Sequence, residues 1–255
     1  MGEFIDMGAK LKKYYKFTPS ELRGIIVSII VLAFIVSFAK WGPGNEIDVG
    51  FGLFNLINAT LIFTLAFIIH YSAQKVAALS VGYNIEYKVW SYGLLIALLL
   101  AFLTKGFIWF LIPGGIIHHH LAGHKLGFFR YGLNYFAVGV TSLMGAVANI
   151  LFAIMLRIIN IALNSTIIDY AIIINLWYAV WSVLPIPPAD GSRMFFGSRM
   201  VYIFGLVAIV AGAGLLHPAF NIPIWFAVIG SLLIALIAWL LYYIFWEKGF
   251  WKGPY

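Results

Sequence analysis

The stretch Val49–Leu79, VGFGLFNLINATLIFTLAFIIHYSAQKVAAL, decides the fold of this chain. It is predominantly apolar up to Ile69, and about 20 such residues suffice for a helix to cross the hydrocarbon core of a membrane. The run then continues into His70 and Gln74, which lie one helical turn apart. Ionisable residues inside a membrane are costly and indicate a functional site. The stretch therefore predicts a spanning helix that ends in a polar site.

The composition of the whole chain agrees with such a helix. Of its 255 residues, 63% are hydrophobic and 10% are charged, and the mean hydropathy is +0.99. These values lie far outside the range of soluble domains. We therefore expect a multi-pass protein of the cell membrane, with residues 1–255 forming a single embedded domain. The chain has no cysteine, which excludes a disulfide framework, a thiolate metal site and a cysteine nucleophile.

The formal net charge is +7, but the basic residues are scattered at the ends of apolar runs. This distribution is typical of membrane topology signals. We therefore expect a lipid bilayer and no nucleic acid as partner. The basic segment before Gly24 lacks a short apolar stretch with a small-residue cleavage site, so we expect no cleaved signal peptide.

Apolar runs recur along the chain. A helix start at Thr18–Leu22, with Pro and an acidic residue in its first turn, precedes the first run. The runs that we expect to form helices are 24–39, 49–79, 92–112, 135–156, 167–183, 201–216 and 222–245. They predict an all-α polytopic membrane protein with about six transmembrane helices, and the run 92–112 is the ambiguous one.

This ambiguous run either crosses the membrane or dips in and returns as a re-entrant segment. Pro113-Gly114-Gly115 ends it. If it returns, then all of the 16 Lys and Arg except Lys40 and Arg157 fall on one face, which the positive-inside rule makes cytoplasmic. We therefore predict a re-entrant segment and a cytoplasmic N-terminus. Irregular backbone at membrane depth must be satisfied by protein or water, so a polar cavity near His70 is expected.

The end of the first stretch has the spacing of a zinc-binding helix. In an H-E-x-x-H helix two imidazoles bind one metal ion, and the Glu is the general base toward the bound water. In this chain Tyr71 stands at the position of the base, and Gln74 stands at the position of the second imidazole.

Two later residues complete the candidate site. Leu184–Gly191 reads LPIPPADG and supplies Asp190, and Asn149 is a polar residue within an apolar run. His70, Gln74 and Asp190 have the chemistry to hold a metal. Alternatively, His70 and Gln74 satisfy each other or a backbone carbonyl, and Asp190 caps the helix that follows it.

At this point the chain resembles the site-2 proteases, which are intramembrane zinc metalloproteases, and especially their archaeal members. The similar segments, in chain order, are Thr18–Arg23, His70–Lys75, Gly82–Tyr87 with Trp90, Pro113–Gly115, Gly145–Asn149 and Leu184–Gly191. An ordered series of motifs is specific where any one of them is weak. The resemblance implies a site-2 protease core over 17–216, with 222–245 as an additional C-terminal transmembrane helix.

The resemblance also implies roles for single residues. His70 and Asp190 correspond to zinc ligands, and Asn149 corresponds to a residue that positions substrate. Gln74 is at best a weak ligand, and Tyr71 cannot replace the carboxylate of the base. Loss of a general base lowers the rate by about 10² to 10⁴. We therefore expect a vestigial site with no bound cofactor, or with zinc if any metal is bound.

Three functions follow from these residues. The leading one is a catalytically inactive site-2 protease homologue, a pseudoprotease, that binds transmembrane segments or serves as a subunit of a membrane complex. Helix binding is implied by the family, whose substrates add to an exposed strand edge near the site. The alternatives are an active intramembrane zinc metalloprotease with altered ligands, and a transporter or channel subunit with a re-entrant segment and a polar cavity.

A second cluster of imidazoles offers a different metal site. The sequence HHHLAGH contains His118, His119, His120 and His124, and the last two have i,i+4 spacing. Because the cluster follows Pro113–Gly115, we expect it in a hairpin or interfacial loop, where helical spacing does not apply. His118, His120 and His124 remain the alternative ligands.

Overall fold

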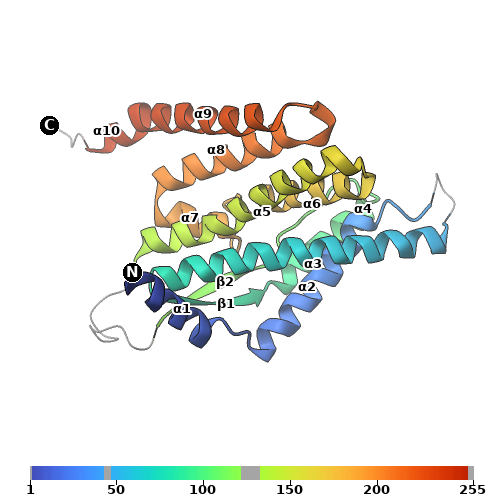
Figure 1. Cartoon of the computed structure of the whole chain (residues 1–255), viewed down its shortest axis with the longest axis horizontal. Coiled ribbons are helices and arrows are strands. Elements are labelled where there is room, and N and C mark those ends of the chain that lie inside the picture. The colour runs from blue at the N-terminus through green and yellow to red at the C-terminus, as the bar shows by residue number, and fades with distance from the viewer. Residues whose placement is uncertain (1, 43–46, 122–132, 252–255) are drawn as a thin grey trace.

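The computed structural model describes residues 2–42, 47–121 and 133–251. They form a mostly helical structure, which Figure 1 shows with its longest axis horizontal. Its elements are α1 (Gly2–Tyr14), α2 (Pro19–Ser37), α3 (Val49–Ser80), β1 (Tyr83–Val89), α4 (Ser91–Leu103), β2 (Gly114–His120), α5 (Tyr135–Leu163), α6 (Thr166–Val183), α7 (Asp190–Gly197), α8 (Arg199–Leu216), η1 (Pro218–Phe220), α9 (Ile224–Tyr242), η2 (Tyr243–Glu247) and α10 (Lys248–Trp251).

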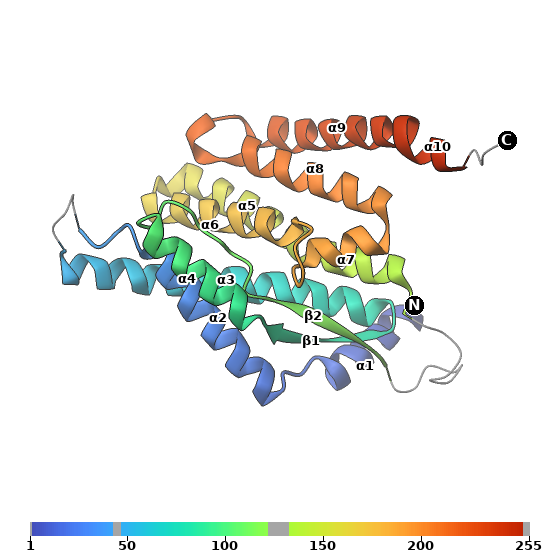
Figure 2. The same cartoon turned by 180° about the vertical axis from the view of Figure 1, so that it is seen from behind.

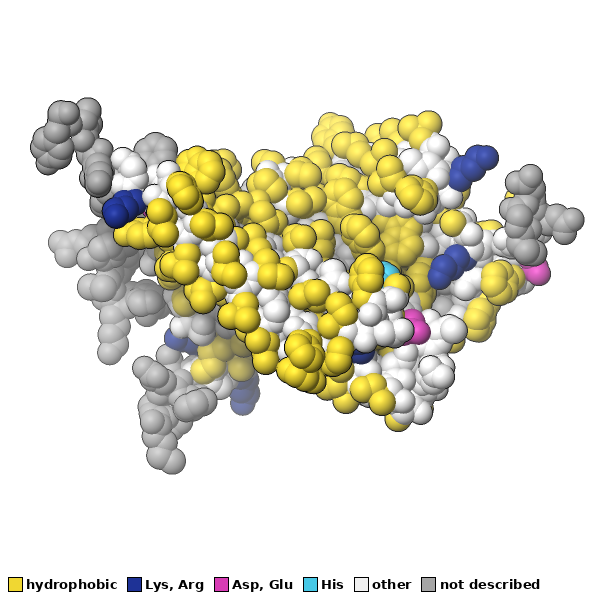
Figure 3. All heavy atoms as spheres, turned by 90° about the horizontal axis from the view of Figure 1, so that it is seen from above, with side chains coloured by type: hydrophobic (Ala, Val, Ile, Leu, Met, Phe, Trp, Pro, Cys, Tyr) yellow, Lys and Arg dark blue, Asp and Glu magenta, His cyan; other side chains and the backbone are white. Residues whose placement is uncertain are grey.

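Within the described residues, six helices are long and apolar enough to cross a membrane. They are α2, α3, α5, α6, α8 and α9, the last with its continuation to Glu247. Large aliphatic side chains such as Ile30, Leu61 and Leu233 are more than half exposed on them. Figure 3 shows one such face, on which hydrophobic side chains dominate and the visible Lys and Arg lie mainly toward the two ends. A chain of this kind is suited to a multi-pass membrane protein.

Helix ends follow local capping rather than the limits of the apolar runs. α2 begins before the apolar run, at the predicted helix start, because Thr18 and Glu21 form a capping box. The Glu21 N–H donates to Thr18 Oγ1 at 3.2 Å, and the Thr18 N–H donates to Glu21 Oε2 at 2.8 Å. At the start of α3, Asp48 Oδ1 accepts the Phe51 N–H at 3.0 Å. Asn164 ends α5 in the left-handed conformation, with φ 47°.

The two strands are a feature that the all-helical prediction lacks. β1 and β2 pair antiparallel, with Tyr83 opposite His120 and Val89 opposite Gly114. Side chains alternate across a strand, and Tyr83, Ile85 and Tyr87 are all buried while the residues between them are only partly buried. Period-two alternation in Tyr83–Val89 is therefore the physical reason for the strand.

The segment between the strands leaves the sheet and returns to it at the same place. The Trp90 N–H donates to the Pro113 carbonyl at 2.8 Å, directly beyond the last paired residues of the sheet. Between these two residues the chain forms α4, which has 13 residues and is too short to span, and an extended return. This geometry is what a re-entrant arrangement of 92–112 requires.

The predicted charge distribution needs one correction, at Lys105. α4 runs beside α2, with the Phe102 and Phe38 rings 4.9 Å apart. A Cβ placed on Gly106 would lie 2.9 Å from the Ala39 backbone nitrogen. Lys105 therefore lies at the end of the molecule that holds Lys40, and not on the face predicted for it. The reason is length, because a helix of 13 residues reaches about 20 Å before the chain turns back.

Helices α3, α5 and α6 form the middle of the structure in both views (Figures 1 and 2). α8 and α9 lie on one side of this middle layer, and α2 with the sheet lies on the other side. The short helix α7 begins at Asp190, after the Pro-rich segment that follows α6. This order brings residues of α3, α5 and the start of α7 together in the interior.

Candidate functional site

His70 is the centre of a buried polar site. Its Nδ1 lies 2.8 Å from Asn149 Oδ1 on α5, and its Nε2 lies 2.9 Å from Asp190 Oδ2 on α7. His70 is 4% exposed, Asn149 is fully buried and Asp190 is 7% exposed. Three residues that were singled out in three separate motifs thus contact one another directly.

A glycine on α5 makes room for the imidazole. A Cβ placed on Gly145 would lie 2.3 Å from His70 Nε2, which is closer than any real contact of two heavy atoms that are not bonded. Gly145 and Asn149 are one helical turn apart on the same helix. The first supplies the space and the second supplies the hydrogen bond, so both residues of the predicted Gly145–Asn149 motif act on His70.

A chain of amides fixes which nitrogen of His70 carries a proton. The Asn175 Nδ2 donates to the Ala171 carbonyl at 2.8 Å, so its Oδ1 accepts the Asn149 Nδ2 at 3.0 Å. The Asn149 Oδ1 must then accept a proton from His70 Nδ1. It follows that Nδ1 is protonated and that Nε2 is the nitrogen that faces Asp190.

The contact between His70 and Asp190 therefore holds one shared proton. A distance of 2.9 Å between Nε2 and Oδ2 is a hydrogen bond, and one of the two atoms must donate. The pair is thus either an imidazolium with a carboxylate or a neutral imidazole with a carboxylic acid. The other carboxyl oxygen, Asp190 Oδ1, is buried and has no hydrogen-bond partner.

Asp190 does not act as a helix cap. It is the first residue of α7, the N-cap is Ala189, and no side chain caps this helix. Gln74 satisfies a backbone carbonyl, as one of the simpler interpretations predicts: its Nε2 donates to the Ser142 carbonyl on α5 at 3.1 Å. Gln74 and His70 thus contact α5 at neighbouring turns, and neither satisfies the other.

Tyr71 lies on another side of α3, toward α2 and the sheet. Its hydroxyl donates to Glu21 Oε1 and lies 3.2 Å from the Ile85 carbonyl. The ring is 3% exposed. The residue at the position of the general base is therefore tied into the packing between α2, α3 and β1.

Glu21 and Lys75 form a buried ion pair that no sequence pattern predicted. Lys75 Nζ lies 3.7 Å from Glu21 Oε1, and their side chains are 1% and 2% exposed. Lys75 also donates to the Lys16 carbonyl at 2.6 Å, and Glu21 Oε1 also accepts the Tyr87 N–H at 3.1 Å. A buried charge is tolerated when it is paired and hydrogen-bonded. The pair joins the start of α2, the end of α3 and β1.

Two other neighbours of His70 were also missed. Asn175 on α6 continues the amide chain, and the Tyr178 ring centre lies 4.9 Å from the imidazole centre. A polar residue inside an apolar run was the available signal for Asn175. Nothing in the sequence distinguishes Tyr178 from the aromatic residues of the other helices.

The second imidazole cluster lies on β2 and not on a helix. His118 Nε2 lies 2.9 Å from Thr141 Oγ1, and Thr141 donates its own proton to the Val138 carbonyl. His118 therefore donates through Nε2. Burial, with a further contribution from the Arg193 charge, lowers the pKa of His118 to about 4, so the ring is neutral at pH 7.

The remaining imidazoles do not join His118 at a common point. Side chains alternate along a strand, so His119 points away from His118 and His120, whose rings lie on one face, 6.1 and 5.1 Å from the Tyr83 ring. His119 lies 3.8 Å from Glu86 across the sheet. His124 lies outside the described residues.

The residues present do not fit a catalytic zinc ion. Such sites use three protein ligands and leave a fourth position for water. His70 and Asp190 provide two, and Gln74 points its amide nitrogen at a carbonyl. In the part of the chain that the structure describes, no group of three His, Asp or Glu residues is arranged to hold a metal ion.

Comparison of the chain with models of known protein families, with curated proteins and with solved structures gives no match. The function must therefore be argued from the geometry of this site and from the motifs of the sequence.

Proposed function

We propose that this chain is a catalytically inactive homologue of the site-2 proteases that binds transmembrane segments of other proteins, alone or as a subunit of a membrane complex. The contact of His70 with Asn149 and Asp190 supports the alignment of the three motifs. Tyr71 and Gln74, which differ from the H-E-x-x-H motif, support the loss of activity.

One observation carries the proposal. The two residues that replace the protease residues are both engaged in structural hydrogen bonds. Tyr71 donates to Glu21, on a side of α3 that faces α2 and the sheet rather than Asp190, and Gln74 donates to the Ser142 carbonyl. Neither a general base nor a second imidazole is left to activate water.

The sheet offers a place for a client segment at only one of its two edges. The Tyr71 hydroxyl lies 3.2 Å from the Ile85 carbonyl and Glu21 accepts the Tyr87 N–H, so the outer edge of β1 is occupied by side chains. In the register, Ile85 lies opposite His118 and Tyr87 opposite Ile116. Paired residues of an antiparallel ladder point their backbone groups the same way, both inward or both outward.

It follows that the N–H and C=O groups of Ile116 and His118 point to the outer edge of β2. Within the described residues the sheet has two strands, so no third strand pairs with that edge. Ile116 is 2% exposed and His118 is partly exposed, so the accessible part of the edge is its His118 end. An extended segment of a client adds to an edge of this kind through backbone hydrogen bonds. β2 is therefore the docking strand in the proposal.

The absence of cysteine makes a direct test possible. Ile117→Cys places a thiol on β2, where the side chain is 39% exposed. Lys88→Cys on the exposed face of β1 is the matched control. Each variant is co-reconstituted with a tagged single-span client that carries one cysteine near its membrane boundary, and disulfide formation and client length are measured.

We expect cross-linking at Ile117→Cys, little at Lys88→Cys, and an uncut client. Cleavage that disappears in His70→Ala would refute the inactive assignment. An uncut client that cross-links equally at both positions, or at neither, would refute docking at β2.

A second candidate, a metalloprotease with altered ligands, rests on one observation. Asp190 Oδ1 is buried without a hydrogen-bond partner, and such an atom in a folded protein calls for an explanation such as a bound ion or water. Measurement of the zinc content separates this candidate from the first.

A further inference from the structure

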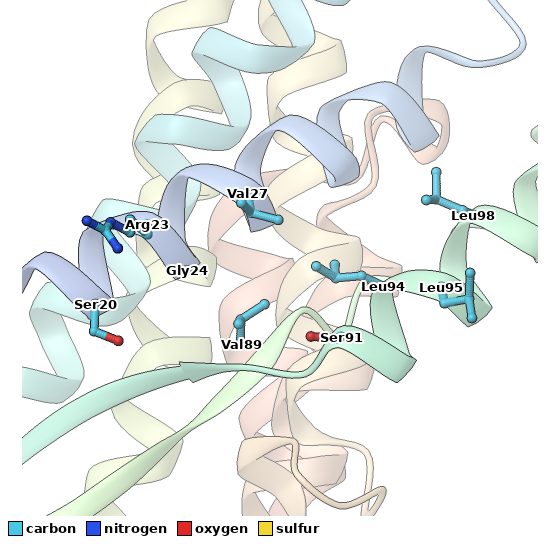
Figure 4. A pocket seen from close by; sticks show the side chains of 9 residues that line it. All are labelled: Ser20, Arg23, Gly24, Val27, Val89, Ser91, Leu94, Leu95 and Leu98. Atoms are coloured by element: carbon cyan, nitrogen blue, oxygen red, sulfur yellow. The ribbon is translucent and has the colours of Figure 1, made fainter.

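An open groove lies between α2 and α4, away from the His70 site. It has a volume of about 560 Å³, which is within the usual range of small-molecule sites. Figure 4 shows the side chains that line it: α2 forms one wall, α4 forms the other, and the end of β1 at Val89 lies between them.

The groove changes in chemistry along its length. Ser20 and Arg23 lie at one end, on the first turns of α2, and Ser91 begins α4 near the middle. Beyond them the walls are aliphatic, with Val27 facing Leu94 and Leu98 farther along α4. A site with a polar end and an aliphatic continuation matches an amphiphile rather than a peptide or a sugar.

Two groups attract an anion: Arg23 at the polar end, and the start of α4 nearer the middle of the groove. Arg23 is exposed, and none of the residues that the structure describes forms an ion pair with it or accepts a hydrogen bond from it. α4 starts at Ser91, and no side chain caps its first N–H groups. An uncapped helix start carries partial positive charge, and a guanidinium binds phosphate through paired N–H donors.

The aliphatic end of the groove opens to the surface that faces lipid. Val27 is 49% exposed and Leu95 is 55% exposed, although both line the groove. α2 is one of the helices that can span a membrane, and Arg23 lies in its first turns, where basic residues meet lipid phosphates. The polar end is thus at headgroup level and the aliphatic end is at the depth of acyl chains.

We propose that this groove binds one anionic phospholipid, with its phosphate at Arg23 and the start of α4 and one acyl chain along Val27, Leu94 and Leu98. The selectivity for an anionic lipid comes from Arg23, because a zwitterionic headgroup brings its own positive charge. The acyl-chain contacts are common to both kinds of lipid.

The test is native mass spectrometry of the full chain released from detergent, with phosphatidylglycerol or phosphatidylcholine of identical acyl chains added at equal concentrations. We expect the wild-type protein to retain one phosphatidylglycerol in preference to phosphatidylcholine. Arg23→Gln lowers phosphatidylglycerol retention about fivefold, the effect of one basic residue at a membrane surface. Arg199→Gln is the control, since Arg199 is also an exposed arginine in the first turn of a spanning helix, and it leaves retention unchanged.

A second pair of variants tests the aliphatic wall. Leu95→Trp fills the groove and removes bound lipid of both kinds. Leu99→Trp, one turn farther along α4 and 53% exposed but not part of the lining, does not. Equal retention of the two lipids by the wild type, unchanged retention in Arg23→Gln, or equal losses in the two Trp variants would each overturn the proposal.

Discussion

Replacement of Gly145 by Ala is the sharpest test of the space around His70. The added methyl group would lie 2.3 Å from His70 Nε2, so the imidazole must move away from α5 by a sizeable fraction of an ångström. That movement breaks or stretches the bonds to Asn149 and Asp190, which are 2.8 and 2.9 Å long. Overpacking and the loss of buried hydrogen bonds together lower the free energy of unfolding by about 2 to 5 kcal/mol.

The matched control is Gly214→Ala on α8, where an added Cβ meets nothing within 4 Å. This substitution causes no overpacking and should raise the free energy of unfolding by up to about 1 kcal/mol, because Ala has a higher helix propensity than Gly. Both variants are compared with the wild type by apparent Tm in one detergent at a fixed scan rate, because unfolding of such proteins is often irreversible. Equal stability of the two variants would refute the position assigned to His70.

A double-mutant cycle separates this contact from a general effect on α5. His70→Ala removes the imidazole and leaves space for the new methyl group. Gly145→Ala should therefore cost much less in a His70→Ala background than in the wild type, with a coupling free energy of about 1 to 3 kcal/mol. Additive effects would show that the two residues do not touch.

Three further predictions follow. A triple variant that combines Tyr71→Glu and Gln74→His with Glu21→Gln should create a zinc site. The third change prevents two carboxylates from facing each other. A folded triple variant without zinc would show that the motif is misaligned. Glu21→Gln alone leaves the Lys75 ammonium buried without its carboxylate and should lower the free energy of unfolding by about 3 to 5 kcal/mol. Glu86→Gln is the control, because Glu86 is partly exposed and pairs with His119, and it should lower that free energy by less than about 1 kcal/mol. Burial lowers the pKa of His118 to about 4, from about 6.5 in the unfolded chain. Between pH 4 and pH 6.5 the unfolded chain therefore binds more protons than the folded one. The free energy of unfolding should fall by up to about 3 kcal/mol as the pH falls from 6.5 to 4. In His118→Gln the apparent Tm should vary less over this range, and an unchanged pH dependence would refute the burial of a neutral ring.

The spanning helices could be predicted because hydropathy over about 20 residues is a strong signal. The start of α2 could also be predicted, from Thr18–Leu22, but other ends could not, since they depend on local features such as the left-handed Asn164 at the end of α5. The strand Tyr83–Val89 has a period-two pattern, but it is short and lies between the expected helices 49–79 and 92–112, so no strand was predicted there.

The contact between His70, Asn149 and Asp190 was expected only from the order of the motifs. Periodicity places His70 and Gln74 on one face of a helix, but it does not say which residues of α5 and α7 meet that face. The ion pair of Glu21 and Lys75 was hidden for a related reason, because the two residues lie on different helices. Hydrophobic pattern alone does not tell a buried, paired charge from an exposed one.

The position of Lys105 shows one basic residue whose predicted place was wrong. The positive-inside rule weighs all basic residues near the membrane ends alike. It cannot anticipate that a helix of 13 residues carries one of them to the other end of α2 before the chain returns to the sheet.

The zinc content of the detergent-purified protein tests the central claim most directly. Elemental analysis compares the zinc content of the wild type with that of His70→Ala, which lacks the strongest ligand in the site, the His70 imidazole. If the chain is an inactive homologue, zinc is well below one ion per chain and does not change in the variant. Near-stoichiometric zinc that is lost in His70→Ala would contradict the account and restore the metalloprotease assignment.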